Sequence, residues 1–169
     1  MLILTRFTTE FCSTQDRIRL TGEGEADDRV QVWLTRRLLD RLLPLVIDWL
    51  PLAEGGAGSG PMASLVSEFQ QQAALSGVVP QPPVKATPTT REWLAEAIDV
   101  NRAADQLGVV LKAPGQAPVG LNFTPVSLRQ WLGILCVAYF QADWPVAVWP
   151  EWIRSSVTQK PSVSPPLLH

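Results

Sequence analysis

The spacing of apolar residues changes from every second position to every third or fourth position at two places, 89 residues apart. At the first place, Val30, Val32 and Leu34 are expected to face inward and to alternate with outward-facing side chains. After Thr35, leucines recur at helical spacing. A shift of 89 residues places Val30 on Val119 and Thr35 on Thr124, where the same change follows. A strand that leads directly into a helix is therefore predicted twice.

The match between the two copies also covers the strand that precedes each of these strand–helix segments. Ile18 and Leu20 alternate with arginines, and the shift places them on Leu107 and Val109. Each copy is thus predicted to be a hairpin with a glycine-containing turn, followed by an amphipathic helix. The first helix contains Pro44, where we expect a kink or the start of a second helical segment.

A further strand is expected to open each copy. Leu2–Thr9 is apolar and rich in β-formers, so the second copy should begin with a strand near Trp93–Val100. A helix over Arg91–Asn101 is the alternative, because Ala, Glu and Leu favour it locally. The predicted fold class is α+β: two antiparallel three-stranded meanders, each followed by an amphipathic helix, in a βββα-αβββα pseudo-repeat. The meanders would form a sandwich or a single sheet covered by helices.

The chain is predicted to hold one α+β domain over residues 1–153. The two copies cover about residues 2–50 and 92–143, and residues 51–90 form a connector rich in glycine and proline. Residues 154–169 are polar and then proline-rich, and we expect a flexible tail there.

The connector contains one more predicted helix, over Met62–Leu75. Its apolar residues recur at helical spacing, and we expect Leu65, Val66, Phe69 and Ala73 to form its buried side. The proline-rich stretch that follows is expected to lie extended across the surface.

The charges nearly balance. Fourteen Lys and Arg residues against sixteen Asp and Glu leave a net charge of −2, which gives no overall positive field for nucleic acid or anionic lipid. The longest uncharged apolar run, Trp131–Phe140, is about half of the roughly twenty residues that span a bilayer. The N-terminus lacks the features of a signal peptide. We therefore expect a cytoplasmic protein that does not associate with membranes.

Few residues are suited to catalysis or metal binding. The only histidine is His169, so histidine-dependent nucleophiles and histidine-based metal sites are not expected. Gly55–Gly60 lacks the Lys-Ser/Thr ending of a phosphate-binding loop. The prediction is a non-enzymatic protein with no catalytic residue, metal or cofactor. An enzyme with a carboxylate or cysteine-based site, the latter from Cys12 or Cys136, stays open as an alternative.

Tryptophan and arginine are over-represented, with seven Trp residues and arginine far more common than lysine. Both types are enriched at interface hot spots. Trp144 is expected to dock on the chain's own core, whereas Trp149 and Trp152 are candidate interface residues in a segment broken by prolines. The favoured function is a protein–protein interaction or assembly module that binds another protein or a second copy, as a homodimer.

Arg36 and Arg37 fall in the first turn of a predicted helix, where a cation costs about 0.3–1 kcal/mol against the helix dipole. They are candidate contacts for an anion or an acidic partner. Nucleic-acid or anion binding by the N-terminal arginines is therefore an alternative function, which requires a shared face free of acids. These arginines are Arg17, Arg19, Arg29, Arg36, Arg37 and Arg41.

Two short motifs carry a family resemblance. Asp16-Arg17-Ile18-Arg19-Leu20 is followed by Trp33-Leu34-Thr35-Arg36-Arg37. This part of the chain resembles a family of small uncharacterised bacterial proteins with a DRI-x-L and WLTRR pattern. The resemblance covers about the first fifty residues, implies a bacterial source and implies no activity.

Overall fold

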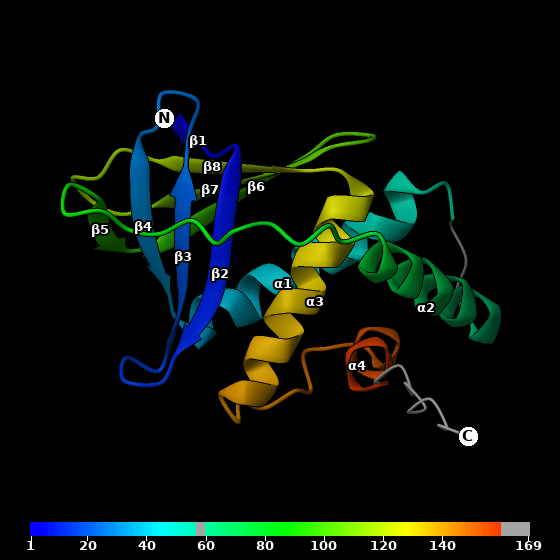
Figure 1. The fold of residues 1–169 in the computed structure, drawn as a ribbon. Coiled ribbons are helices and arrows are strands. Elements are labelled where there is room, and N and C mark those ends of the chain that lie inside the picture. Colours follow the sequence, from blue (N-terminus) through cyan, green and yellow to red (C-terminus); the bar gives the residue numbers. More distant parts are fainter. Residues whose placement is uncertain (57–59, 160–169) are drawn as a thin grey trace, which may run out of the picture.

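The computed structural model describes residues 1–56 and 60–159 (Figure 1). In these residues the protein is α+β, with eight strands in two four-stranded sheets and four helices. The elements in chain order are β1 (Leu2–Ile3), β2 (Arg6–Cys12), β3 (Arg17–Glu23), β4 (Arg29–Leu34), α1 (Arg36–Ala53), α2 (Pro61–Ser76), β5 (Arg91–Leu94), β6 (Ala97–Arg102), β7 (Leu107–Lys112), β8 (Val119–Phe123), α3 (Pro125–Gln141) and α4 (Glu151–Thr158).

The first sheet has the strand order β2-β3-β4-β5. Strands β2, β3 and β4 are antiparallel to their neighbours, with Ile18 opposite Leu34 and Leu20 opposite Val32. The short β5 then pairs with β4 in the parallel direction, which places Trp93 opposite Val32. This sheet is therefore mixed.

The second sheet has the order β1-β8-β7-β6. Strands β6, β7 and β8 are antiparallel, with Val109 opposite Leu121, and β1 is added parallel to β8, with Leu2 opposite Val119. Each sheet is completed by a short strand from the other half of the chain, so the expectation of purely antiparallel meanders is wrong. Figure 1 shows that the strands of one sheet cross those of the other.

The strands that open each half differ in detail from the prediction. Leu2–Thr9 does not form one strand, because the chain leaves the second sheet after Ile3 and enters the first sheet at Arg6. The ambiguous segment near Trp93–Val100 is extended rather than helical, and it divides into β5 and β6. The division allows these two strands to join different sheets.

The hairpins and helices predicted from the change of period are present in both halves. Thr35 caps α1, where its side chain accepts a hydrogen bond from the Leu38 N–H, and Thr124 caps α3 by accepting from the Ser127 N–H. Helix α1 continues through Pro44, so no second helical segment starts there. One hydrophobic core includes residues of both sheets, α1, α3 and α4.

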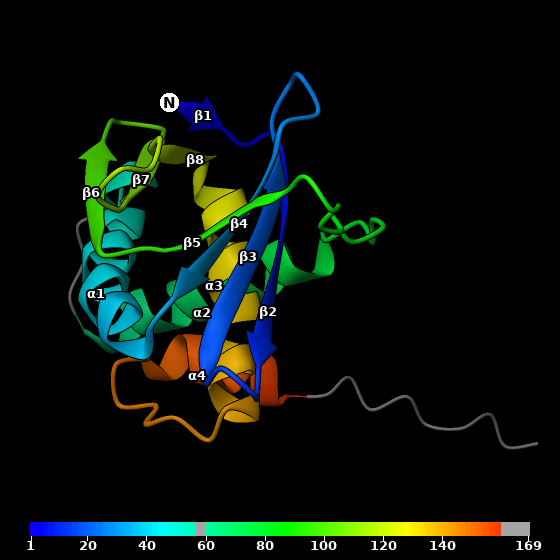
Figure 2. The same ribbon diagram turned by 90° about the vertical axis from the view of Figure 1, so that its left-hand side faces the viewer.

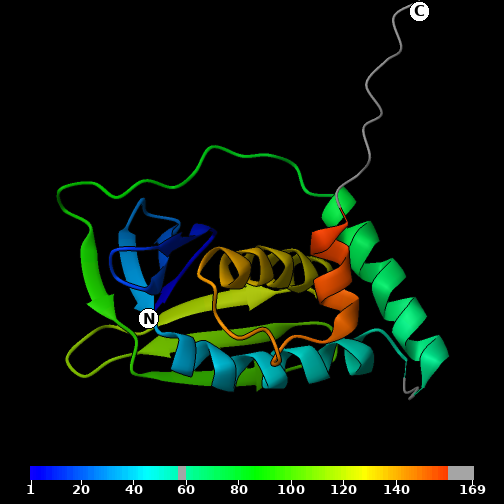
Figure 3. The same cartoon turned by 90° about the horizontal axis from the view of Figure 1, so that it is seen from below.

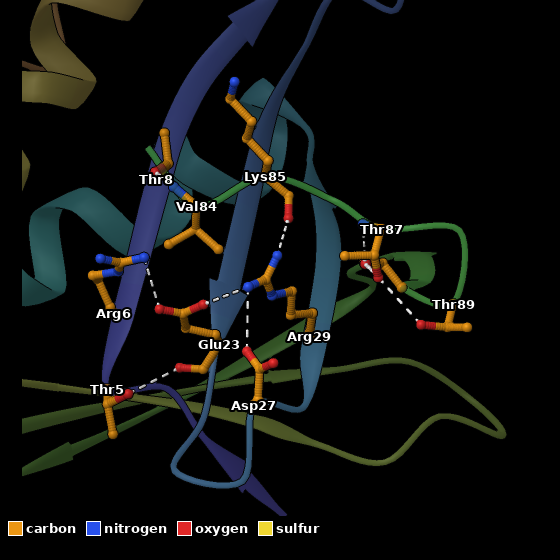
Figure 4. Close-up of polar contacts among 11 residues, drawn as sticks. Thr5, Arg6, Thr8, Glu23, Asp27, Arg29, Val84, Lys85, Thr87 and Thr89 are labelled. Atoms are coloured by element: carbon orange, nitrogen blue, oxygen red, sulfur yellow. Dashed lines mark hydrogen bonds and ion pairs between the residues drawn. The ribbon is translucent and has the colours of Figure 1, made fainter. Parts of the chain in front are cut away.

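Helices α2 and α4 lie against α3, away from the first sheet (Figure 3). After α2, residues 77–90 connect the helix to β5. They cross the outer face of β2, β3 and β4 (Figure 2). Val84 is buried there and its N–H donates to Thr8 Oγ1 at 2.8 Å, while Arg29 donates to the Lys85 carbonyl at 3.0 Å (Figure 4). The connector is therefore extended across the surface, as predicted, and fixed to the sheet.

The C-terminal part is more ordered than the sequence indicated. Residues 154–158 belong to α4, whereas 160–169, the rest of the predicted tail, lie outside the described residues. Among the helices that the structure describes, none has the length and apolarity needed to cross a membrane.

Candidate interaction surface

Helix α2 directs most of its large apolar side chains into solvent. Met62 is 73% exposed, Leu65 61%, Val66 49% and Phe69 73%. Residues three, four and seven positions apart share one side of a helix, so these four side chains form a continuous surface, the α2 face. The expectation that Leu65, Val66, Phe69 and Ala73 form the buried side is wrong, since Ala73 is exposed as well.

The opposite side of α2 is buried and largely polar. Gln71 is fully buried and Ala74 nearly so, and Ser67 and Gln70 are partly buried beside them. Amphipathic helices of globular proteins normally bury the apolar side. Helix α2 therefore has the reverse orientation, which needs a physical cause.

Arg129 of α3 supplies this cause. Its side chain is buried, and its Nε and Nη2 atoms donate to the two carboxylate oxygens of Glu54 at 3.0 and 2.7 Å. Arg129 also donates to the Gln70 side chain at 3.0 Å and to the Ser67 carbonyl at 3.2 Å. A buried charge is tolerated only when it is paired and hydrogen-bonded, and α2 provides part of that pairing from its polar side.

Further polar contacts fix α2 along its length. Gln71 donates to the Arg129 carbonyl at 2.8 Å, and Gln130 donates to the Ala74 carbonyl at 3.0 Å. Glu68 accepts a hydrogen bond from Ser155 of α4. These contacts hold the helix in one rotation about its axis, with the α2 face outward.

The α2 face carries no charge. The sequence contains no Lys or Arg between Arg41 and Lys85. Glu68, the only charged residue of α2, is engaged with α4. The surface is therefore apolar and electrically neutral.

A pocket of about 330 Å³ lies beside the α2 face, between the end of α1 and the start of α2. Pro51, Met62, Ala63 and Val66 are among its lining residues. Leu52, at the end of α1, is 66% exposed. The pocket adds concave apolar surface to the convex α2 face.

A larger groove of about 590 Å³ lies between β2 and α3. Its walls include Phe11, Ile134 and Val137. Glu10 is the ionisable residue in its lining, and its carboxylate pairs with Arg19 at 2.9 Å. The groove thus presents apolar walls and a carboxylate that is already neutralised.

Of the two tryptophans predicted as interface residues, Trp149 is not on the surface. Trp149 is only 2% exposed, and its ring packs edge-on against Tyr139 with centroids 5.3 Å apart. Trp152 is partly buried under the Arg129 guanidinium, 5.0 Å from its ring centroid. Trp144 is buried in the chain's own core, as predicted. Trp149 is thus corrected to a core residue, and Trp152 covers the buried arginine.

The candidate anion-binding arginines are spread over the structure. Arg36 is exposed and lies 3.8 Å from Asp40, while Arg37 is exposed on the same turn. Arg29 pairs with Glu23 and Asp27 on the outer face of the first sheet (Figure 4). Arg19, Arg29 and Arg36 are therefore paired with acids, so the N-terminal arginines do not form the acid-free face that anion binding requires.

The two cysteines occupy different environments. Cys136 is buried in α3, and burial raises the pKa of its thiol to about 12. Cys12 lies partly exposed at the end of β2, where a hydrogen bond with Thr14 lowers the pKa of its thiol. In residues 1–56 and 60–159, no cluster of three acidic, cysteine or histidine side chains is arranged to hold a metal ion.

No family model, curated protein or solved structure matches the chain. The resemblance to small bacterial proteins stays a prediction for this reason.

Sequence reasoning missed Arg129 and Glu54, which determine how α2 is oriented. One signal was available, because Arg129 is the only charged residue in the apolar helix α3. A single charge in such a helix indicates a buried polar network.

Proposed function

We propose that this chain is a non-enzymatic protein–protein interaction module and that the α2 face is its binding surface. The observation that supports this proposal is the reversed orientation of α2, with its polar side held by Arg129 and its apolar side in solvent. Contiguous apolar surface on a folded protein is typical of interaction sites. Burial of such surface stabilises a complex by about 25 cal/mol for each Å² before the costs of association.

The neutrality of the α2 face favours a protein partner. Binding to anionic lipid depends on Lys and Arg beside the apolar side chains, and binding to nucleic acid depends on an array of cations. Neither is present between Arg41 and Lys85. A neutral apolar surface is instead suited to a complementary apolar surface of a protein.

We also propose that α2 is held by a pseudo-repeat of two βββα units, β2–β4 with α1 and β6–β8 with α3, and that the short strand before each unit joins the sheet of the other unit. The equivalent N-caps Thr35 and Thr124 support this proposal, as does the reciprocal addition of β5 to β4 and of β1 to β8. In this architecture α2 is an insertion between the two units. Its apolar side is then not required for either unit's core and is available for binding.

Site-directed photo-crosslinking in cells tests the proposed surface. A benzophenone amino acid placed at Leu65 should give an adduct with a protein chain, because the partner covers this position. The same residue at Asn122, which is exposed on β8, serves as the control and should give no such adduct. Equal adducts at both positions, or none at Leu65, would contradict the proposal.

A further inference from the structure

We propose that the partner of the α2 face is a second copy of this chain, bound through an antiparallel pair of α2 helices about a twofold axis. This inference rests on the proposed function. The partner is inferred from the arrangement of the side chains on the α2 face.

The α2 face has a pattern that complements itself. Met62, Leu65, Val66 and Phe69 are spaced symmetrically about the midpoint between Leu65 and Val66. An antiparallel pair centred there sets Met62 opposite the partner's Phe69 and Leu65 opposite the partner's Val66. A twofold axis makes each of these contacts twice, as in the closed dimers that are the commonest oligomers.

The same arrangement brings a protruding ring to a pocket. Phe69 is 73% exposed on the α2 face, and the pocket of about 330 Å³ runs beside α2 from Met62 to Gln70. Pairing Phe69 with the partner's Met62 places the ring at the mouth of the partner's pocket. An aromatic side chain in an apolar pocket is the usual form of an interface hot spot.

The charge of the surface also favours a second copy. In a twofold dimer, groups near the axis meet their own equivalents, so any charge there faces a like charge. The α2 face has none, and Glu68 is engaged by Ser155 on the side of α4. A second copy therefore brings no like charges together across the two α2 faces.

The size of the surface indicates a weak dimer. A helix of 16 residues is about 24 Å long, and stable interfaces bury about 800 Å² on each partner. The α2 face is one side of a single helix, and the exposed Leu52 at the end of α1 adds to it. We therefore expect a dimer that dissociates at micromolar concentrations, which is typical of interfaces at the small end of the range.

Sedimentation velocity on the purified full chain over a concentration series tests the register of this dimer. Met62→Glu and Phe69→Lys should each weaken self-association by about tenfold or more, because each places an unpaired charge in the apolar contact between Met62 and the partner's Phe69. The double variant M62E/F69K should recover most of the loss, because each Glu then faces a Lys of the second copy. Leu45→Lys, on the exposed side of α1, is the matched control and should associate like the wild type.

Each outcome bears on the proposal. A wild-type chain that remains monomeric at several hundred micromolar would overturn it, as would single variants that the double variant fails to restore. Melting curves establish that the variants are folded, and Met62→Ala and Phe69→Ala provide milder single variants that should also weaken self-association. If Leu65 crosslinks a different protein while the purified chain stays monomeric, the proposed function holds and only the second copy is excluded.

Discussion

Arg129 is the single charged residue of α3, and its guanidinium group is surrounded by Glu54, Gln70, Ser67 and the ring of Trp152. The guanidinium has a planar array of donors, and the bidentate contact with Glu54 uses two of them. The remaining donors need acceptors, because an unpaired donor in the interior costs free energy. The polar side of α2 supplies these acceptors.

Replacing Arg129 should strongly destabilise the protein. Arg129→Met leaves Glu54 and the α2 acceptors without a partner, and we expect the free energy of unfolding to fall by about 3 kcal/mol. This is the low end of the range for a buried pair, because Glu54 retains some contact with solvent. Urea unfolding measures the change, with Arg37→Met, at an exposed arginine in the first turn of α1, as the control. A loss below about 0.5 kcal/mol would show that the network does not hold α2.

The two thiols should differ in reactivity. The thiolate is the reactive form, so the lowered pKa of Cys12 makes it reactive at lower pH than an ordinary cysteine, whereas burial keeps Cys136 protonated. Alkylation of the native protein at neutral pH, followed by mass spectrometry, should label Cys12 alone. Both should be labelled in denaturant. Rapid labelling of Cys136 in the native protein would contradict its placement in the core.

Helix α1 is anchored to the protein by the apolar side chains on its buried side. Leu42 and Val46 face the core, whereas Leu45, one residue away from Val46, is exposed. Leu42→Ala should lower the free energy of unfolding by about 2–5 kcal/mol, because it removes buried methyl groups and leaves a cavity. Leu45→Ala should change it by less than about 0.5 kcal/mol, as at other exposed positions. Chemical denaturation of the two variants measures the difference, and similar losses would mean that α1 is rotated.

Helix α4 is part of the core rather than a separable binding segment. Ile153 is fully buried, and α4 packs against α2 and α3. Ile153→Ala should therefore cost about 2–5 kcal/mol of unfolding free energy. Glu151→Ala, at the exposed start of the same helix, is the control. A melting temperature within a degree of wild type for Ile153→Ala would restore the view that this segment serves a partner.

Short-range patterns predicted the elements whose structure depends on neighbouring residues. The hairpins, α1 and α3 all follow from apolar spacing. The exchange of β1 and β5 could not be predicted, because these strands are short and pair with residues from the other half of the chain. Periodicity carries no information about such distant pairing.

The orientation of α2 shows a second limit. Helical spacing correctly grouped Leu65, Val66 and Phe69 on one side, but it could not say whether that side faces the core. The choice depends on Arg129, which is distant in sequence and binds the polar side. The residues of the α2 face could therefore be grouped from the sequence, but their exposure to solvent could not be predicted.

In the whole molecule, the two sheets are interlocked because each contains a strand from the other half. The connector is fixed across the first sheet, and α2 and α4 are fixed to α3 (Figures 1 and 3). The apolar side of α2 is thus exposed on a fold whose other elements are fixed to one another. The proposed binding surface and the proposed second copy both follow from this arrangement.

Thiol labelling of α2 in a Cys12→Ser background tests the arrangement most directly. Leu65→Cys should react quickly in dilute solution and become protected as the protein concentration rises, because a second copy then covers it. Ala74→Cys should react slowly at every concentration, because Ala74 is buried against α3. Fast labelling of Ala74→Cys with slow labelling of Leu65→Cys in dilute protein would show that the apolar side of α2 faces inward, and would contradict the account.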